Sequence, residues 1–209
     1  MCADLPDAAR YLLVKKMGMV PAALRQAPPG IAGRYDNAWA AVEELASHLG
    51  RLPAGMLRFL ADHPRGYLIV GDRTGYEPGD SEVQGKRRAN VAHVSIADVA
   101  APFPCLCVTA ALVDHLLGCA GEPVGDWLSD GGGMDPRLVA LGQQIGRLCA
   151  LGYAVDDAAR GSRRDYLAHS LAWYILDRRR LNVADPQIER LLKRSLMDER
   201  FWTGRPPPA

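Results

Sequence analysis

The segment CLCVTAALVDHLLGCA, residues 105–120, contains the longest apolar run of the chain and carries Asp114 and His115 within it. Pro102 and Pro104 delimit a turn in front of it, so the sequence predicts a helix over the whole segment. The apolar run is well short of the roughly 20 residues that a membrane span requires. We therefore expect a buried helix and no transmembrane segment.

Amphipathic helices are expected on both sides of this segment. Apolar residues recur at helical spacing between Asn37 and Leu49, and a second helix opens at Leu52-Pro53. Helical patterns also cover residues 136–151, 164–176 and 185–196. Nearer the N-terminus, residues 7–19 fit a short helix, which the two prolines of Ala27–Gly30 separate from the next one.

Two short segments have the composition of strands. Residues 67–70 (YLIV) are rich in residues that favour strands, and residues 91–96 (VAHVSI) show strand-like alternation. We expect the two to pair in a small sheet. The polar residues 71–90 between them are predicted to form a loop, either a lid over a site or a plain connection facing solvent.

The length of the chain indicates one domain. Its 209 residues can bury one sizeable core, whereas two domains would each be small for independent stability. We predict an α+β fold, mostly helical, with a small β-sheet packed on the helices. Residues 1–36 are interpreted as an N-terminal helix and linker, residues 37–203 as the main domain, and residues 204–209 as a disordered tail.

Charge and cysteine content argue against several classes of function. The chain has 25 Lys+Arg against 24 Asp+Glu, so no overall field draws it to nucleic acid or to an anionic membrane. The basic runs at residues 86–88 and 178–180 lack interleaved aromatic residues and are interpreted as solvated faces. The five cysteines are odd in number and no secretory leader is recognisable, so we expect a reduced, cytoplasmic setting.

The spacing of His115 and Cys119 places both side chains on one face of the predicted helix. Zinc peptidases carry two histidines at this spacing, with a glutamate beside the first that activates the metal-bound water. Gly118 matches the small residue that commonly precedes the second ligand, whereas Leu116 stands at the glutamate position. A histidine and a cysteine four residues apart on an apolar helix can equally be buried core residues, so the spacing alone leaves both interpretations open.

The order of the surrounding segments adds a family resemblance. A helix opened by Leu52-Pro53, a strand, a polar loop, a second strand, the helix with His115 and a later helix with Asp165 follow one another. In this order the chain resembles the zincin metallopeptidase domains similar to the catalytic domain of anthrax lethal factor, with a degenerate motif that reads His-Leu-Leu-Gly-Cys. The resemblance covers residues 37–202 and implies a zincin-like fold.

The resemblance also implies roles for individual residues. Asp165 takes the third metal-ligand position beside His115 and Cys119, and such a set is chemically acceptable to zinc. His169 takes the position of the family's second glutamate on the later helix. Tyr153 is the nearest upstream match to the tyrosine that assists the family's transition state, and two tyrosines of the later helix are alternatives.

The departures from the family pattern decide the expected function. Leu116 cannot take a proton from water, and loss of such a base costs about 10²- to 10⁴-fold in rate. We therefore expect no classical peptidase activity, and zinc binding is left open. The first hypothesis is a module that binds a peptide, a protein or a small molecule in the former active-site cleft. The alternative is an enzyme of another reaction, such as one of specialised metabolism, using His115, Cys119, Asp165 or His169 for metal-dependent or acid–base chemistry.

Other residues give weaker indications. His93 and Asp114 suggest a His–Asp pair, and Cys105 or Cys107 could act as a nucleophile near a histidine, although no sequence signature accompanies them. Both cysteines are equally explained as small buried apolar residues. If the family resemblance is accidental, the chain is an unrelated helical domain with a small sheet.

Overall fold

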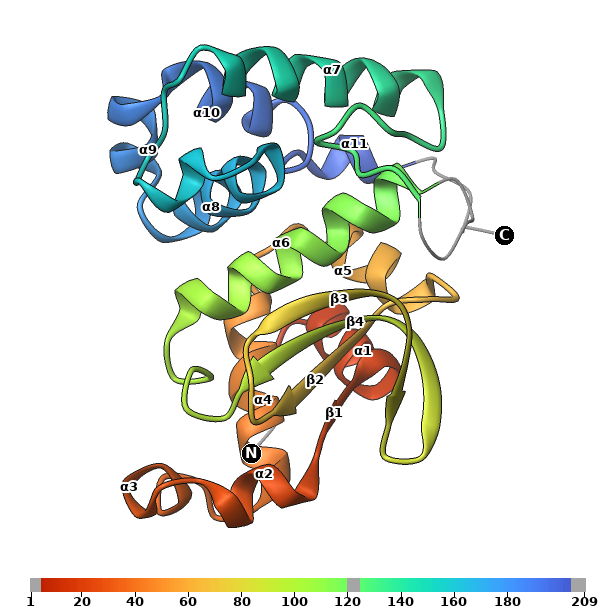
Figure 1. Ribbon diagram of the computed structural model, residues 1–209, viewed down its shortest axis with the longest axis vertical. Helices are drawn as coiled ribbons and strands as arrows, with labels where there is room; N and C mark the ends of the chain where they lie inside the picture. Colours follow the sequence, from red (N-terminus) through yellow and green to blue (C-terminus); the bar gives the residue numbers. More distant parts are fainter. Residues whose placement is uncertain (1–4, 120–124, 204–209) are drawn as a thin grey trace.

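The computed structural model describes residues 5–119 and 125–203 (Figure 1). Helices predominate and accompany one four-stranded sheet, so the predicted, mostly helical α+β class is confirmed. The elements in chain order are α1 (Asp7–Lys16), β1 (Met17–Met19), α2 (Pro21–Gln26), α3 (Pro29–Ala32), α4 (Ala38–Leu49), α5 (Ala54–Asp62), β2 (Tyr67–Gly71), β3 (Gly75–Val83), β4 (Lys86–Ser95), α6 (Pro102–Gly118), α7 (Pro136–Ala150), the 3₁₀ turn η1 (Ala158–Arg160), α8 (Arg163–Leu176), α9 (Arg178–Ala184), α10 (Pro186–Lys193) and α11 (Glu199–Trp202).

The sheet has the strand order β1-β2-β4-β3. β1, β2 and β4 run parallel, with Leu68 of β2 opposite Met17 on one side and Ala92 on the other. β3 lies at the edge and pairs antiparallel with β4. The predicted pairing of the two strand segments is confirmed, because the β2–β4 register joins Tyr67 to Val91.

The prediction of a loop over residues 71–90 is wrong, because most of these residues form β3 and the first half of β4. Gln84 and Gly85 make the turn between the strands, and both have positive φ (55° and 70°), as tight hairpin turns require. Pro78 lies within a register irregularity of β3. The irregularity disturbs the alternation by which a strand is identified, and an edge strand tolerates it.

The N-terminal residues join the same core as the rest of the chain. α1 ends at Lys16, and Met17–Met19, predicted to be helical, form β1 at one edge of the sheet. α1 packs against α4 and α5, and its Leu12 and Leu13 belong to the main hydrophobic core. The tail predicted over residues 204–209 lies outside the described residues.

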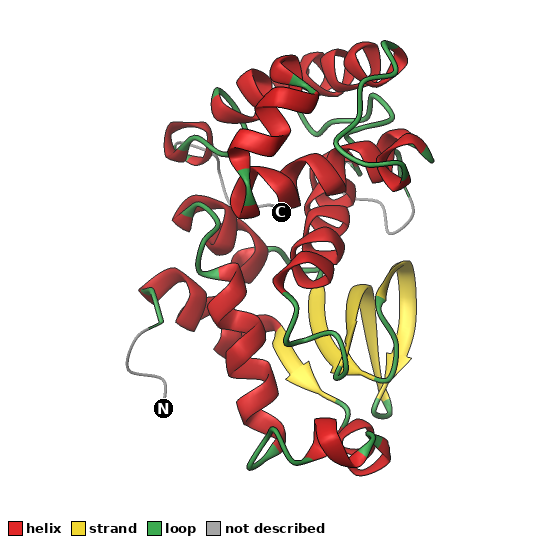
Figure 2. Ribbon diagram, turned by 90° about the vertical axis from the view of Figure 1, so that its left-hand side faces the viewer, coloured by secondary structure: helices red, strands yellow, loops and turns green. Residues whose placement is uncertain are grey.

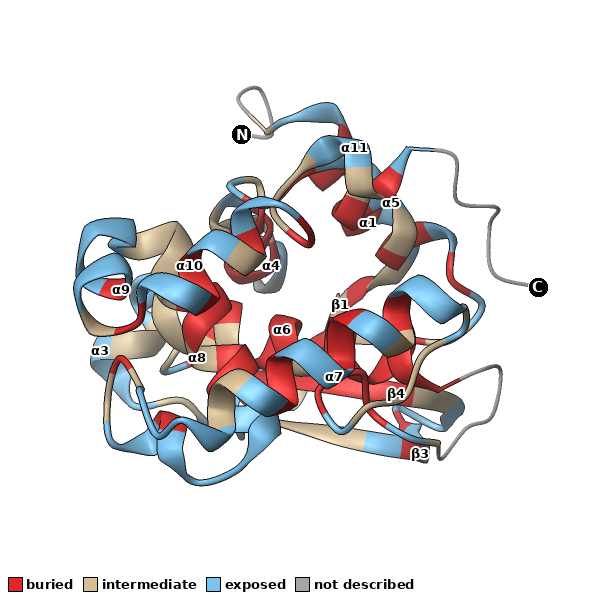
Figure 3. Cartoon of the chain, turned by 90° about the horizontal axis from the view of Figure 1, so that it is seen from above, coloured by how far each residue is buried: buried red, intermediate tan, exposed pale blue. Residues whose placement is uncertain are grey.

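α6 lies between the sheet and the C-terminal helices α7 to α10 (Figure 1). It contacts β3, β4 and α4 on one side, and α8 and α7 on the other. The helices gather mainly on one side of the sheet (Figure 2). On that side Leu68 and Val94 enter the main core, whereas Ile69, Val83 and Val91 form a small separate cluster. Figure 3 shows α6 buried at the centre while much of α7 faces solvent.

The bounds of α6 differ slightly from the prediction. The helix begins at Pro102, because a proline in the first turn costs no hydrogen bond. It ends at Gly118, and Cys119 follows with a non-helical ψ of 97°; the predicted last residue, Ala120, lies outside the described residues. Neither α6 nor any other helix within the described residues is long and apolar enough to cross a membrane.

The other predicted helices of the main domain are confirmed as α4, α5, α7, α8 and α10. Four of them begin after a side chain that accepts a hydrogen bond from a first-turn N–H, as stable N-caps do. These caps are Asn37, Asp135, Ser162 and Asp185. The basic run at residues 178–180 opens α9, an additional short helix capped by Asp177.

Two helix glycines admit the backbone of the loop that follows α6. A Cβ on Gly118 of α6 would overlap the backbone N of Leu128, and a Cβ on Gly142 of α7 would overlap its carbonyl oxygen. The loop backbone is therefore held between the two helices at a separation that only glycine permits.

Candidate functional site

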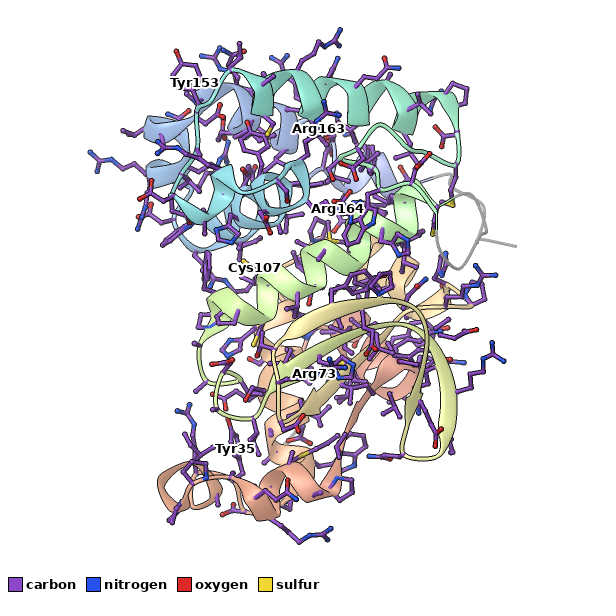
Figure 4. All side chains as sticks on the ribbon, in the orientation of Figure 1. Tyr35, Arg73, Cys107, Tyr153, Arg163 and Arg164 are labelled. Carbon is purple, nitrogen blue, oxygen red and sulfur yellow. The ribbon has the colours of Figure 1, made fainter. Side chains whose placement is uncertain are left out.

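A cleft of about 390 Å³ lies between the edge strand β3, the middle of α6 and the N-terminal half of α8. It is lined by Tyr76, Pro78, Cys107, Val108, Ala111, Trp127, Ser162, Arg164, Asp165, Ala168 and His169. Figure 4 shows Cys107 and Arg164 close to the boundary between α6 and α8. Two predicted site residues, Asp165 and His169, therefore line one cleft, whereas His115, Cys119 and Tyr153 are not among the residues that line it.

His115 is completely buried behind the wall of this cleft. Its Nδ1 lies 2.6 Å from the hydroxyl of Tyr76, which comes from β3. The indole of Trp127 packs on its other side, with ring centroids 5.0 Å apart. Tyr76 and Trp127 also meet edge to face at 5.3 Å, so their two rings close the cleft over the imidazole.

The environment of His115 keeps its imidazole neutral. Burial lowers its pKa to about 4, the positive charge of Arg164 acts in the same direction, and a backbone group of Gly125 opposes the shift only in part. Within the described residues, Nε2 makes no hydrogen bond of good geometry. A neutral imidazole sealed from solvent does not exchange protons readily with a ligand in the cleft.

Arg164 holds Trp127 in place. Its guanidinium lies over the indole ring at 4.2 Å from the centroid, and it forms an ion pair of 2.8 Å with Asp130. The cation–π contact and the ion pair act on one side chain, so the first turn of α8 is tied to the loop that carries Trp127.

The buried carboxylate of Asp114 binds the same loop. Its carboxylate accepts hydrogen bonds from the backbone N of Ser129 at 2.8 Å and from the Ser129 hydroxyl at 2.6 Å. Burial raises the pKa of Asp114 to about 7, although the two bonds from Ser129 act against this. Asp114 is thus bonded to Ser129 and forms no pair with a histidine. His93, the other member of the suggested pair, lies 3.2 Å from Glu77 at the strand edge.

Leu116, at the position of a catalytic glutamate, is part of the core. Its side chain has no exposed area. A Cβ added to Gly66 would lie 2.8 Å from Leu116 Cδ1, so the leucine fills the space beside the Gly66 backbone.

The three predicted zinc ligands are not brought together. Cys119 is buried just beyond the end of α6, and burial raises the pKa of its thiol. Asp165 is exposed on α8, where its carboxylate accepts a hydrogen bond of 2.6 Å from the Ser162 hydroxyl. Across residues 5–119 and 125–203, no three His, Cys, Asp or Glu side chains are placed to hold a metal ion. The residues do not fit the zinc site that the family resemblance implies.

We expect that chelation by EDTA leaves the thermal midpoint of the protein unchanged, because a ligand that binds only the folded state stabilises it and its removal would lower the midpoint. Elemental analysis of protein purified without a histidine tag should find no stoichiometric zinc in the parent, in His115→Ala or in Cys119→Ala. Near-stoichiometric zinc in the parent that disappears in both variants would contradict this expectation.

Among the predicted site residues, His169 is the one whose imidazole is bonded to a carboxylate. Its Nδ1 lies 2.8 and 3.0 Å from the two carboxylate oxygens of Asp156, which also accepts a bond of 2.9 Å from Trp173 Nε1. Burial tends to raise the pKa of Asp156, but the bonds from His169 and Trp173 outweigh it and lower the pKa. Phe103 packs edge to face on the imidazole at 5.2 Å. The imidazole is thus oriented by a carboxylate at the wall of the cleft.

Tyr153 lies away from the cleft, exposed on the turn after α7 (Figure 4). The tyrosine that reaches His115 is Tyr76, which the sequence did not indicate. A signal was present, since Tyr76 is the only aromatic residue within the polar stretch of residues 71–90. Of the suggested nucleophiles, Cys107 lines the cleft, but burial first and then the charge of Asp156 raise its pKa to about 12. Burial likewise raises the pKa of Cys105 to about 12.

Comparison of the chain with models of protein families, with curated proteins and with solved structures finds no match. Interpretation of the site therefore depends on its own geometry. That geometry combines an open cleft, a sealed neutral histidine, protonated thiols and one carboxylate-bound imidazole.

Proposed function

We propose that this protein is a non-catalytic binding module that holds a short extended peptide in the cleft between β3, α6 and α8. The observation that carries this proposal is that the cleft is open while the residues of the degenerate motif are committed to packing. His115 is bonded to Tyr76 and sealed, and Leu116 is in the core. A zinc peptidase with this motif requires an accessible metal ligand and a base at these two positions.

The edge strand suggests how a peptide would be held. β3 pairs with β4 along one side, no other described strand pairs with its outer side, and its Tyr76 and Pro78 line the cleft. An exposed strand edge offers N–H and C=O groups to an added extended chain, and neighbouring pockets then select its side chains. Val108 and Ala111 give the cleft an apolar floor, and its volume is at the lower end of the range for ligand pockets. One or two side chains of the peptide would fill it.

The proposal also draws on the zincin-like resemblance of the sequence. The helix opened by Leu52-Pro53 (α5), the parallel strands β2 and β4, the motif helix α6 and the later helix α8 follow one another in the order of the family that the sequence resembles. In such a domain the cleft beside the motif helix is the substrate groove. A domain converted from catalysis to binding would keep the groove and lose the catalytic groups.

One observation favours a second candidate, an enzyme that uses His169 as an acid–base group. The Asp156–His169 pair has the arrangement in which a carboxylate orients an imidazole, and His169 lines the cleft. Neither candidate nucleophile among the described cleft residues is paired with this imidazole, because burial keeps the Cys107 thiol protonated and the Ser162 hydroxyl donates its hydrogen bond to Asp165. Binding is therefore better supported than catalysis by His169.

The test is selection from a random octapeptide library with the parent and with Ala111→Phe, whose ring would occupy the cleft. Ala111 is a floor residue of the cleft, whereas Ala150, at the exposed end of α7, serves for a matched Ala150→Phe control. We expect peptides that bind the parent and the control but bind Ala111→Phe about tenfold more weakly or worse. Equal binding by Ala111→Phe, with its fold verified by circular dichroism, would sink the proposal.

The same peptides distinguish the two candidate functions. After prolonged incubation they should be recovered unchanged by mass spectrometry. Conversion of a peptide by the parent, lost in His169→Asn while binding persists, would replace the binding module with the enzyme.

A further inference from the structure

A second and larger groove, of about 1140 Å³, lies between α7 and the C-terminal segment that contains α10 and α11. Five of its lining residues are arginines, contributed by α7, by α10 with its C-cap and by α11. They are Arg137, Arg147, Arg190, Arg194 and Arg200. All five are exposed, so their guanidinium groups stand at the rim of the groove. The groove is separate from the cleft proposed above, since the two share no lining residue.

None of these five guanidinium groups forms an ion pair or hydrogen bond with another residue of the described part of the chain. Several arginines elsewhere do have acidic partners, such as Arg34 with Glu44 and Arg164 with Asp130. Among the described residues that line the groove, the only acidic one is Asp135. Its carboxylate accepts hydrogen bonds from backbone N–H groups at the start of α7. A chain with nearly balanced charge therefore concentrates unpaired positive charge on one surface.

The floor of the groove is apolar. Leu141 and Leu148 lie on the inner face of α7, and Leu191 and Phe201 approach from the opposite side. Arginine stems can lie along apolar surface while their charged ends stay at the rim. The groove thus combines an apolar base with cationic edges.

The apolar base and the cationic rim together favour one class of acidic partner over nucleic acid and membranes. Nucleic acid without sequence preference is usually held by aromatic side chains that stack on successive bases, and Phe201 is the only aromatic residue among the described residues that line the groove. A flat anionic membrane surface cannot reach the apolar base of a groove between two helices. A helix with one acidic and one apolar face matches both features, because helix-in-groove recognition buries apolar anchors while charged residues meet at the rim.

We propose that the groove between α7 and α10 binds an acidic amphipathic helix of a partner protein. Arg137 and Arg147 are ten residues apart on α7, about 15 Å along the helix axis, which corresponds to about three turns of a bound helix. Carboxylates of the partner pair with the guanidinium groups, whose planar donors suit carboxylate oxygens. Its leucine or phenylalanine side chains cover the apolar base.

The test uses a fluorescein-labelled peptide of about 18 residues with leucine on one helical face and glutamate on the other. Its affinity is measured by fluorescence anisotropy for the parent and for the Arg147→Glu/Arg194→Glu double variant. The matched control is Arg25→Glu/Arg58→Glu, which changes net charge equally at exposed arginines outside the groove. We expect the groove variant to weaken binding about tenfold or more and the control to leave it nearly unchanged. Added salt should weaken binding by the parent.

Several outcomes would overturn the proposal. One is an equal loss in the control variant, which would show a response to net charge alone. Another is equal or tighter binding of extended polyglutamate, of oligo-dT or of phosphatidylserine vesicles. Since Ala111→Phe changes the other cleft only, it should leave this binding intact, so failure of one proposal is distinguishable from failure of the other.

Discussion

Gly142→Ala is expected to lower the free energy of unfolding by about 3 kcal/mol, because an extra methyl group at this position has no space to enter. The added Cβ would overlap the carbonyl oxygen of Leu128, which is backbone and cannot rotate away as a side chain does. This overlap is relieved only if the loop that carries Trp127 shifts away from α7. The measurement is urea unfolding at 25 °C, followed by circular dichroism.

Gly146→Ala is the matched control, four residues later on the same helix. Its Cβ would meet the guanidinium of Arg163 at 3.3 Å, the far end of a flexible side chain. Alanine is also about 1 kcal/mol better than glycine within a helix, so this variant should be as stable as the parent or slightly more stable. Equal destabilisation by both substitutions would contradict the tight contact between α7 and the loop.

Leu116→Glu, which would restore the motif glutamate, is expected to destabilise the protein by about 4 kcal/mol and to create no peptidase activity. Leu116 has no exposed area and packs beside Gly66, so a carboxylate there is desolvated without a partner. The neighbouring His115 is bonded to Tyr76 and does not present a metal-binding face to the cleft. Urea unfolding and a fluorogenic casein assay with added zinc measure the two effects.

Leu116→Met provides the control for this experiment. Its side chain conserves volume and apolar character, so the loss of stability should stay below about 1.5 kcal/mol. Zinc-dependent cleavage of casein by Leu116→Glu would show that the position still faces a functional site, and the interpretation of the cleft as a binding groove would fall.

The helices could be predicted from the sequence because their signals are local. Spacing of apolar residues and N-caps such as Asn37 and Ser162 lie within the segments they define. Strands β1 and β3 could not be predicted in the same manner. β1 has three residues and is specified by its parallel partner β2, far along the chain, whereas β3 is polar, irregular at Pro78 and held by its pairing with β4.

The site was predictable only in part for the same reason. His115 stood out because it interrupts an apolar helix, and His169 because it lies on the later helix. Their surroundings come from distant segments, since Tyr76 reaches His115 from β3 and Asp156 reaches His169 from the loop before α8. The five arginines of the larger groove are scattered through the sequence and gather only when α7 and α10 pack.

The strand order has a consequence for synthesis on the ribosome. β1 is the first strand to emerge, but it lies at an edge of the sheet. It cannot pair until β2 has followed, after α2, α3, α4 and α5 have been made. β4 emerges last of the strands yet occupies an interior position, and α6, which covers the sheet, comes later still. Parallel pairs between distant segments form slowly because the long loops between them must close first. The apolar residues of β1 and β2 therefore stay outside a complete sheet until β4 has emerged, and a chaperone that holds incompletely folded chains would have its greatest effect in this interval.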